Sequence, residues 1–323
     1  MKIVVTGAAG FVGSHLCERL VADGHLVVGI DGMIADSYAS ADKEQNLAAL
    51  ADCSTFRLFR LDLRRDDLDE AFDGAEVVVH LAAMPGLPVS WKRLDLYAGC
   101  NILATGRVIE ATTIAGADRF VQVSTSSVYG RFAVGDETQP QVPNSPYGLT
   151  KLAAEHLVLA HHRNFGFPAL ILRYFSIYGP RQRPDMAYHL FIESILDGQP
   201  ITMFGDGQQA RSNTYVDDCV DATVRAVHDG RIGEAYNVGG GELLELRHAI
   251  TLIGELAGRA PEIIRRPAIP GDQRITQADT TKAREHFGYE PRIGPRVGLQ
   301  RQLEWHLDRR SRGDRSTLLK EIA

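Results

Sequence analysis

The sequence predicts an α/β fold in which a doubly wound parallel sheet carries a smaller α/β lobe at its C-terminal side. Short apolar runs alternate with helical patterns through the first half of the chain, which is typical of parallel strands joined by crossover helices. The first run leads through three glycines directly into a helical pattern. From residue 176 onward the chain becomes rich in proline, glycine and arginine. These three observations together favour two lobes.

The composition supports this division and excludes several classes of protein. A chain of 323 residues is too long for most single cores. The net charge is -6, so nothing favours nucleic acid as a partner. No apolar run approaches the length of a membrane span, and the first residues resemble a strand rather than a secretion signal. The four cysteines have no metal-ligand spacing, so we expect no metal site, reduced thiols and a cytoplasmic location.

Residues 3–5 are the first predicted strand, and residues 11–22 are the helix that follows. Between them lie Gly7, Gly10 and Gly13, in the spacing GxxGxxG. Glycines in this context let the backbone approach a dinucleotide pyrophosphate at the helix N-terminus, where amide groups point outward. No Gly-Lys-Ser/Thr follows, which excludes a phosphate-loop nucleotidase. The alternative is a plain tight turn before a helix.

The next two predicted strands each end at a carboxylate. Residues 27–30 end at Asp31, which is placed to accept hydrogen bonds from both adenosine ribose hydroxyls and to repel a 2′-phosphate. This favours NAD over NADP. Residues 33–51 are polar and predict a loop with a helix. Residues 55–61 form the third strand, and Asp62 after it is placed to meet the adenine amino group. A solvated strand end explains Asp62 equally well.

The fourth strand, residues 76–81, is apolar almost throughout, so we expect it to be buried on both faces. His80 lies within it and is predicted to be a hydrogen-bonded core residue rather than a catalytic one. Two small alanines follow, which would let a cofactor lie close to the backbone. Residues 101–115 carry helical periodicity, and residues 119–123 make the fifth strand.

A cluster of hydroxyl groups, residues 124–127, ends the fifth strand. Ligands bind outside the carboxyl ends of the strands in open α/β sheets, so we expect this cluster to contact a ligand. Serines at strand ends also commonly cap backbone groups. Further along, Ser145 and Pro146 predict a helix start, and that helix places Tyr147 and Lys151 on one face.

Tyr147 and Lys151 together predict proton transfer. A free tyrosine has a pKa of about 10 and is a poor base at neutral pH. A nearby ammonium and a nicotinamide cation would favour the phenolate, and a pKa of about 7 requires roughly 4 kcal/mol of stabilisation. Such a pair can take a proton from an alcohol while hydride leaves the same carbon. An isolated Tyr-x-x-x-Lys is more often an ordinary helix face.

The sixth strand, residues 169–174, ends at the boundary between the lobes. Arginines of the loops beyond it could clamp a phosphorylated substrate, although such arginines often only solvate a surface. The later elements are predicted as a helix at 186–196, a strand at 201–204, a helix at 215–227, a strand at 236–238, and then polar helices with a frayed tail from 309. The expected lobes are 1–175 with about 214–240 for the cofactor, and 176–213 with 241–323 for the substrate.

The whole set of motifs resembles the extended short-chain dehydrogenase/reductase family of nucleotide-sugar epimerases and dehydratases. The resemblance covers nearly the whole chain. Residues 124–130 and 178–186 are most similar to bacterial UDP-glucuronic acid 4-epimerases. The residues that carry it are Gly7, Gly10, Gly13, Asp31, Asp62, His80-Leu81-Ala82-Ala83, 124–130, Tyr147, Lys151, Arg173-Tyr174-Phe175, Tyr178-Gly179-Pro180-Arg181, Gly205-Asp206-Gly207, 215–218 and 236–239.

The resemblance implies a Rossmann-type lobe with tightly held NAD, a smaller lobe that grips the nucleotide diphosphate, and a homodimer built on paired helices. It implies catalytic roles for Thr125, Tyr147 and Lys151. The cofactor contacts that it implies are Gly7, Gly10, Phe11, Val12, Gly13, Asp31, Asp62, Leu63, Leu81, Ala82, Ala83, Tyr147, Lys151 and Tyr174. The substrate contacts predicted for this chain are Ser126, Ser127, Ser176, Arg183, Arg211 and Arg274.

The residues at positions 126 and 127 narrow the reaction. Sugar dehydratases of this family usually carry Asp-Glu there, and glucuronate decarboxylases carry glutamate at the second position, whereas this chain has two serines. We therefore predict a 4-epimerase that interconverts UDP-glucuronate and UDP-galacturonate, with Thr125, Ser126, Ser127 and Ser176 holding the carboxylate. The alternatives are a UDP-glucuronate decarboxylase giving UDP-xylose or its 4-keto form, a neutral-hexose 4-epimerase, and a non-catalytic NAD-sensing regulator.

Two departures from the family pattern lie in the predicted substrate site. Ser176 stands where relatives of this subgroup often carry threonine and galactose-type epimerases asparagine. Ser212 and Asn213 replace the Asp-Phe of the commoner Arg-Asp-Phe-Thr-Tyr. The second change alters the nucleotide-facing loop and could shift nucleotide preference or the grip on a keto intermediate.

Overall fold

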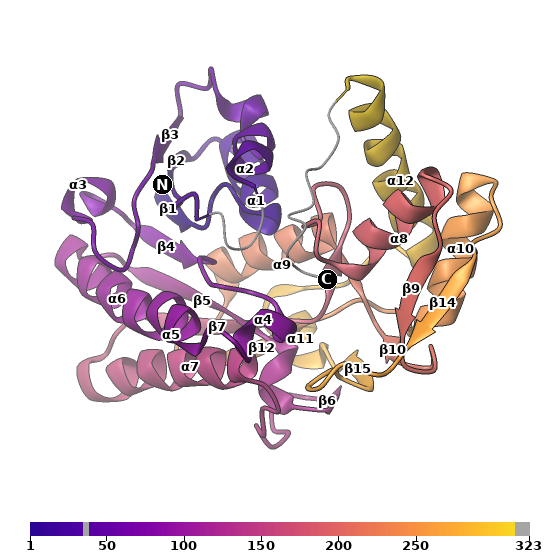
Figure 1. Cartoon of the computed structure of the whole chain (residues 1–323). Coiled ribbons are helices and arrows are strands. Elements are labelled where there is room, and N and C mark those ends of the chain that lie inside the picture. Colours follow the sequence, from indigo (N-terminus) through magenta and orange to yellow (C-terminus); the bar gives the residue numbers. More distant parts are fainter. Residues whose placement is uncertain (35–38, 314–323) are drawn as a thin grey trace.

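A computed structural model describes residues 1–34 and 39–313 of the chain. Seven parallel strands form the central sheet, in the order β12-β7-β5-β4-β1-β2-β3 (Figure 1). The strand order reverses direction between β1 and β4, which is where open α/β sheets bind ligands. The strands are β1 (Lys2–Thr6), β2 (Leu26–Ile30), β3 (Phe56–Phe59), β4 (Val77–His80), β5 (Arg119–Thr125), β7 (Ala169–Tyr174) and β12 (Ala235–Val238).

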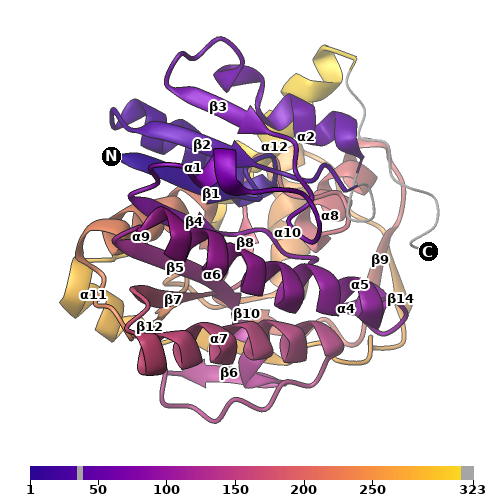
Figure 2. The ribbon, with the colours of Figure 1, turned by 90° about the vertical axis from the view of Figure 1, so that its left-hand side faces the viewer.

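Helices cover both faces of this sheet (Figure 2). Alternate strand residues point to opposite faces, so Val4 joins a buried cluster with Val108, whereas Ile3 joins another with Leu16. One face carries α1 (Phe11–Ala22), α9 (Val216–Asp229) and α11 (Thr281–Phe287); the other carries α3 (Asp69–Phe72), α6 (Ala104–Ala115) and α7 (Pro146–Phe165). The predicted doubly wound α/β fold is confirmed.

Three smaller sheets and further helices complete the molecule. The sheets have the orders β13-β10-β15-β6, β11-β8 and β14-β9. Their strands are β6 (Phe132–Gly135), β8 (Ile177–Tyr178), β9 (Ile201–Phe204), β10 (Ala210–Arg211), β11 (Thr214–Tyr215), β13 (Leu244–Glu245), β14 (Ile263–Arg266) and β15 (Ile275–Ala278). The remaining helices and helical turns are α2 (Ser40–Asn46), η1 (Ala48–Leu50), α4 (Leu87–Ser90), α5 (Leu94–Ala98), η2 (Gly99–Leu103), η3 (Ser126–Tyr129), α8 (Ala187–Leu196), α10 (Leu246–Ala257) and α12 (Pro295–Ser311).

The C-terminal part differs from the prediction of polar helices. It contains the strands β13, β14 and β15, and α10 buries Ile250 and Ile253. These strands have two to four residues each, and β14 is exposed along its whole length. Such short or charged strands carry no alternating pattern that a sequence could reveal.

Two helix boundaries also differ. The helix predicted for residues 101–115 begins at Ala104, because the π-helical turn η2 precedes it. The predicted frayed tail from residue 309 is wrong at its start: Arg309 lies within α12, is buried, and donates to Asp42 at 2.8 Å. The rest of that tail, residues 314–323, and part of the loop predicted after Asp31, residues 35–38, lie outside the described residues. Among the described helices, none has both the length and the apolar character needed to cross a bilayer.

Candidate active site

A cleft of about 650 Å³ opens at the carboxyl ends of β1, β4 and β5 and is closed on its far side by the smaller sheets. Residues from both halves of the chain line it. The lining includes every residue that the sequence predicted for cofactor binding, substrate binding or catalysis, with the exception of Arg274. The topology therefore brings together in one cleft residues from Gly7 to Gln273.

The glycine turn after β1 forms a cradle that no larger residue could occupy. Gly7 has a φ of +74°, and a Cβ there would lie 2.9 Å from the backbone nitrogen of Ala82. A Cβ on Gly13 would lie 2.0 Å from the carbonyl oxygen of Gly7. No side chain caps α1, and its first residue Phe11 lines the cleft. This arrangement fits a dinucleotide whose pyrophosphate lies at the helix N-terminus.

Asp31 ends β2 as a buried carboxylate at the edge of the cleft. It accepts hydrogen bonds from the backbone N–H groups of Ala9, at 3.2 Å, and of Met33, at 2.8 Å. The ammonium of Lys43 on α2 lies 3.2 Å from the same carboxylate and also lines the cleft. Sequence reasoning missed Lys43, since a single lysine in a polar segment gives no signal. The carboxylate is thus fixed where ribose hydroxyls would meet it.

Asp62 follows β3, and Arg64 holds its carboxylate in a two-pronged pair. The Nε of Arg64 donates to Oδ1 at 2.8 Å, and its Nη2 donates to Oδ2 at 2.7 Å. These bonds lower the pKa of Asp62, so it is ionised at neutral pH. Asp62 lines the cleft, where an adenine amino group could reach its carboxylate. Arg64 already occupies some of the hydrogen-bond acceptor positions of this carboxylate.

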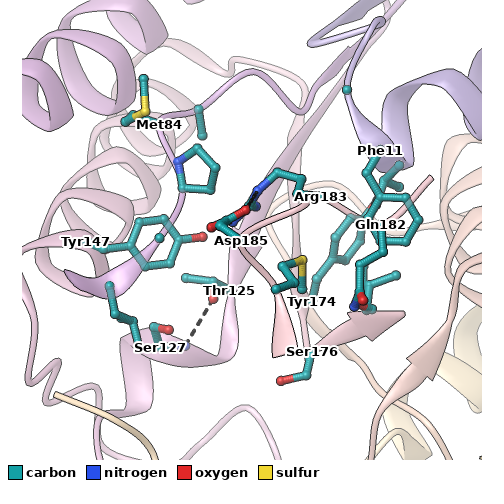
Figure 3. Close-up of a pocket in the computed structure, with 18 of the residues that line it drawn as sticks. Phe11, Met84, Thr125, Ser127, Tyr147, Tyr174, Ser176, Gln182, Arg183 and Asp185 are labelled. Carbon is teal, nitrogen blue, oxygen red and sulfur yellow. Dashed lines mark hydrogen bonds and ion pairs between the residues drawn. The ribbon is translucent and has the colours of Figure 1, made fainter. Parts of the chain in front are cut away.

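The helix α7 begins as the sequence predicted. Ser145 accepts a hydrogen bond from the backbone N–H of Gly148 at 3.1 Å, and Pro146 is the first helical residue. A Cβ on Gly148 would lie 2.6 Å from the carbonyl oxygen of Ser127, so α7 packs directly against the turn η3. This close approach brings the hydroxyl of Tyr147 to the hydroxyl of Thr125 (Figure 3).

Burial, Thr125 and Arg183 set the pKa of Tyr147. Burial raises the pKa of Tyr147, while the hydrogen bond from Thr125 and the positive charge of Arg183 lower it, with a net rise. The ammonium of Lys151 donates to the carbonyl of Val123 at 2.6 Å. Among the protein's own groups, burial therefore outweighs the favourable contacts, and the pKa of Tyr147 lies above its ordinary value. Burial lowers the pKa of Lys151 itself to about 8, and Glu155 opposes this shift.

The hydroxyl cluster lies in the turn η3 at the floor of the cleft. Thr125 accepts a hydrogen bond from the backbone N–H of Ser127 at 3.2 Å, which folds the turn (Figure 3). Ser126 and Ser127 are buried and line the cleft. Ser176, in the loop after β7, also lines the cleft and has a φ of +22°, a left-handed backbone conformation that is uncommon for serine. The four predicted hydroxyls are thus brought together.

Arg183 and Arg211 are the two predicted arginines that reach the cleft. Arg183 pairs with Asp185 at 2.8 Å, opposite Tyr147 (Figure 3). Arg211 donates through Nη2 to the carboxylate of Asp272 at 2.7 Å, while its Nη1 is buried without a partner in the described part of the chain. A guanidinium group that lines a cleft can bind an anionic ligand group.

Arg274 requires a correction. Its guanidinium donates to the carboxylate of Asp206 at 2.6 Å and 3.0 Å and to the side-chain oxygen of Gln208 at 3.0 Å. Neither Arg274 nor Asp206 lines the cleft. Its loop context in the sequence predicts a substrate contact, but Arg274 lies beside β10, immediately before β15, and its side chain forms an ion pair with Asp206.

The comparisons with known proteins agree with this geometry. The model of the NAD dependent epimerase/dehydratase family matches residues 3–239. The chain belongs to this family. A Bacillus subtilis protein described as an uncharacterized UDP-glucose epimerase is 41% identical over 309 residues, which cover 94% of this chain and 98% of the relative. The dTDP-glucose 4,6-dehydratase of Streptomyces niveus is 34% identical over 318 residues, covering 96% and 94% respectively.

Solved structures of this epimerase/dehydratase family show the same fold. The UDP-glucuronic acid 4-epimerase of Bacillus cereus, solved in complex with UDP-glucuronic acid and NAD, superimposes with a TM-score of 0.93 at 40% identity. The match covers 95% of this chain and 99% of that structure. Sequence identity alone does not show which reaction of the family this chain catalyses, because an epimerase and a dehydratase are both more than 30% identical to it. The reaction must be inferred from the residues of the site.

Several lining residues escaped sequence reasoning. Asp185, Gln273 and Tyr188 line the cleft, although none of them was assigned a role from the sequence. The amide of Asn213, one of the two noted departures, donates a hydrogen bond to the hydroxyl of Tyr188. The fold brings such partners together, and a single sequence does not show that they are neighbours. Tyr174, which was predicted, lines the cleft and shares a hydrogen bond of 2.6 Å with Thr223.

His80 is a hydrogen-bonded core histidine, as predicted. Its Nδ1 lies 2.7 Å from the hydroxyl of Thr6, and its Nε2 lies 3.1 Å from the hydroxyl of Thr105. Thr105 donates its own proton to the carbonyl of Asn101, so it must accept from Nε2. Burial lowers the pKa of His80 to about 3, and the ring is neutral.

One cluster in the described part of the chain offers metal-ligand atoms. His189, Glu193 and His306 place such atoms within 4.8 Å of one another, between α8 and α12. None of the three lines the cleft. Glu193 already bonds His306 and Arg310, so a cation there would meet positive charge. The cluster supports no catalytic assignment.

Proposed function

We propose that the protein is an NAD-dependent 4-epimerase that interconverts UDP-glucuronate and UDP-galacturonate. The observation that carries the proposal is the floor of the cleft. Thr125, Tyr147 and Lys151 provide the means to oxidise a sugar at C4, while Ser126 and Ser127 occupy the positions where dehydratases and decarboxylases carry carboxylates. The similar Bacillus cereus enzyme, which holds UDP-glucuronic acid and NAD, supports this choice of substrate and cofactor.

The chain's own residues divide the reaction among them. Tyr147 takes the proton from the C4 hydroxyl and later returns it to the C4 oxygen, while Thr125 shares a hydrogen bond with that oxygen. Lys151 binds the nicotinamide ribose and supplies a positive charge near the phenolate. NAD in the cradle after β1 would accept hydride from C4 and return it, and its cationic ring would lower the pKa of Tyr147. No net redox change results.

Epimerisation requires the keto sugar to rotate without losing carbon dioxide. A 4-keto uronate is a β-keto acid, which decarboxylates when the bond to its carboxylate stands perpendicular to the carbonyl plane. The neutral hydroxyl groups of Thr125, Ser127 and Ser176 line the cleft and can restrain the carboxylate without supplying an acid or base. The same floor offers no carboxylate side chain at positions 126 and 127 to assist the loss of carbon dioxide.

We assign NAD and the nucleotide sugar to different parts of the cleft. We infer that residues 1–175 with about 214–240 hold NAD, and that residues 176–213 with 241–323 hold the nucleotide sugar. Arg211 supports this division, because it lines the cleft from β10 and its guanidinium group could bind a diphosphate oxygen.

The test is incubation of purified protein and NAD with UDP-glucuronate, followed by proton NMR and by measurement of carbon dioxide. Formation of UDP-galacturonate without carbon dioxide is expected. Release of carbon dioxide with a UDP-pentose or keto-pentose would show the alternative decarboxylase. Turnover of UDP-glucose alone would show a neutral-hexose epimerase, and dTDP-glucuronate tests the nucleotide preference. The matched control is Tyr147→Phe, which keeps the ring and removes the proton-transfer group.

We also propose a cytoplasmic homodimer. Ile114 on α6 and Phe165 on α7 are 72% and 78% exposed, and the two helices lie side by side on one face of the sheet (Figure 2). A second copy of the chain could cover these apolar side chains. All four cysteines lie in the described ranges as free thiols, which supports a reducing compartment. Light scattering of purified protein measures the oligomeric state.

A further inference from the structure

Gln273 connects the small sheets to the catalytic turn through one buried side chain. It lies in the loop before β15, and both it and Ser126 line the cleft. Its amide nitrogen donates to the carbonyl of Ser126 at 3.2 Å and to the carbonyl of Gly130 at 2.8 Å. Two carbonyl acceptors fix which end of the carboxamide is nitrogen, since an oxygen there would face two oxygens. The carboxamide therefore has one orientation.

The fixed carboxamide decides how Ser126 uses its single proton. The side-chain oxygen of Gln273 lies 3.2 Å from the hydroxyl of Ser126, which donates to it. A serine hydroxyl has one proton and two lone pairs. With its proton engaged, Ser126 offers only lone pairs to a ligand. A sugar carboxylate can only accept hydrogen bonds, so it gains nothing from Ser126 in this state, whereas a C6 hydroxyl could donate to it.

Gln273 is also hydrogen-bonded to Arg211 of the cleft. Arg211 donates to the backbone carbonyl of Gln273 at 2.8 Å and to the carboxylate of the adjacent Asp272 at 2.7 Å. The proposed diphosphate end and the floor that faces the sugar therefore meet at one short segment of chain. A side chain placed there can affect sugar recognition without itself contacting the reacting carbon.

We infer that Gln273 is a positioning residue that sets the specificity for the C6 substituent, by holding Ser126 as an acceptor and weakening its use as a donor to a carboxylate. The inference rests on the proposed function, in which positions 126 and 127 face the C5–C6 end of the sugar. It accounts for why Ser126 and Ser127 need not be equivalent: the Ser126 hydroxyl donates to Gln273, whereas no such bond to Gln273 is found for Ser127 in the same described turn.

The test compares affinities for UDP-glucuronate and UDP-glucose by calorimetry, using NAD-loaded protein that carries Tyr147→Phe so that neither ligand turns over. The change is Gln273→Met, which keeps the length of the side chain and removes both hydrogen-bonding ends. The matched control is Gln277→Met, an exposed position on β15. Each change is also made together with Ser126→Ala, which removes the hydroxyl through which Gln273 is proposed to act.

Gln273→Met should shift the affinity ratio toward UDP-glucuronate by about fivefold, the effect of one hydrogen bond of ordinary strength. The shift should disappear in the Ser126→Ala background and be absent from Gln277→Met. An equal weakening of both ligands, or a shift that persists without the Ser126 hydroxyl, would overturn the inference, since a general disturbance of the turn predicts either result. Failure of both nucleotide sugars to bind the Tyr147→Phe protein would also overturn it.

The outcome separates the inference from the proposed function. Turnover of UDP-glucuronate is measured on the otherwise unchanged protein. If no UDP-galacturonate forms but the affinity ratio shifts through Ser126, the proposed reaction is wrong and the role of Gln273 stands. If UDP-galacturonate forms and the ratio does not move, the role of Gln273 is wrong and the reaction stands.

Discussion

Arg173 on β7 donates to both carboxylate oxygens of Glu155 on α7, in a layer closed to solvent. Its Nε lies 3.1 Å from Oε1, its Nη2 lies 2.8 Å from Oε2, and the side chains are 3% and 1% exposed. Glu155 lies one helical turn beyond Lys151. Arg173 also donates to the hydroxyl of Tyr129, at 2.8 Å, at the end of η3. One buried ion pair therefore fixes both the helix of Tyr147 and the turn that begins at Thr125.

Replacing Glu155 by glutamine should damage both stability and the pH dependence of the enzyme. The change leaves the Arg173 charge unpaired in the interior, which typically costs about 3–5 kcal/mol in the free energy of unfolding. It also removes the negative charge that raises the pKa of Lys151. Urea titration measures the first effect. The control is Glu110→Gln on α6, an exposed residue whose replacement should change stability by less than about 0.5 kcal/mol. Equal losses for the two variants would contradict the assigned role.

The activity of the wild-type protein should fall as pH rises through about 8. Burial lowers the pKa of Lys151 from 10.5 to about 8, so the positive charge near Tyr147 is lost well below the pH at which an exposed lysine would lose it. The measurement is kcat/KM for UDP-glucuronate between pH 6 and pH 10. Glu155→Gln should move the descending limb to lower pH, because it removes the group that opposes the shift. A wild-type profile that stays level to pH 10 would refute this assignment.

His80 should make the fold sensitive to acid. Its pKa is about 3 in the folded protein, below the value of 6.5 for an unperturbed histidine. Between these values the unfolded chain binds a proton that the folded protein does not, so the free energy of unfolding decreases as pH falls from 6.5 toward 3. At pH 5 the protonation of this residue in the unfolded chain lowers the free energy of unfolding by about 2 kcal/mol.

The variant His80→Gln tests this dependence, because glutamine can accept from Thr6 and donate to Thr105 without titrating. Its free energy of unfolding should decrease less steeply with acid than that of the wild type. The comparison is needed because burial also lowers the pKa of His15 to about 4, so the wild-type slope has several sources. His156→Gln, exposed on α7, is the control. Parallel slopes for wild type and His80→Gln would exclude the proposed contribution.

Much of the central sheet could be predicted from sequence because each strand is a short apolar run with a recognisable neighbour. The glycine turn, Asp31 and the Ser145-Pro146 helix start each carry a local physical signal. The structure places the first two at the cleft, and the third begins the helix that brings Tyr147 there. Local signals of this kind survive because the residues that create them are adjacent in the chain.

The missed features depend on contacts between distant residues. Lys43 is ordinary in sequence and becomes part of the cleft only because α2 folds back onto Asp31. Gln273 meets Ser126 across 147 positions. The net rise in the pKa of Tyr147 in the protein alone could not be predicted either, because sequence spacing places Lys151 on the same helix face but does not show how deeply the tyrosine is buried. The predicted substrate contact of Arg274 was wrong for the same reason, because its ion pair with Asp206 depends on how distant segments fold together.

The most direct test of the proposed epimerase uses UDP-glucuronate that carries deuterium at C4. The proposed mechanism removes hydride from that carbon and returns it to the other face of the same sugar. Proton NMR should therefore show UDP-galacturonate that retains deuterium at C4, with no carbon dioxide released, and Tyr147→Phe should slow its formation by about 10²-fold or more. A product with protium at C4, or a UDP-pentose accompanied by carbon dioxide, would contradict epimerisation by transient oxidation at C4.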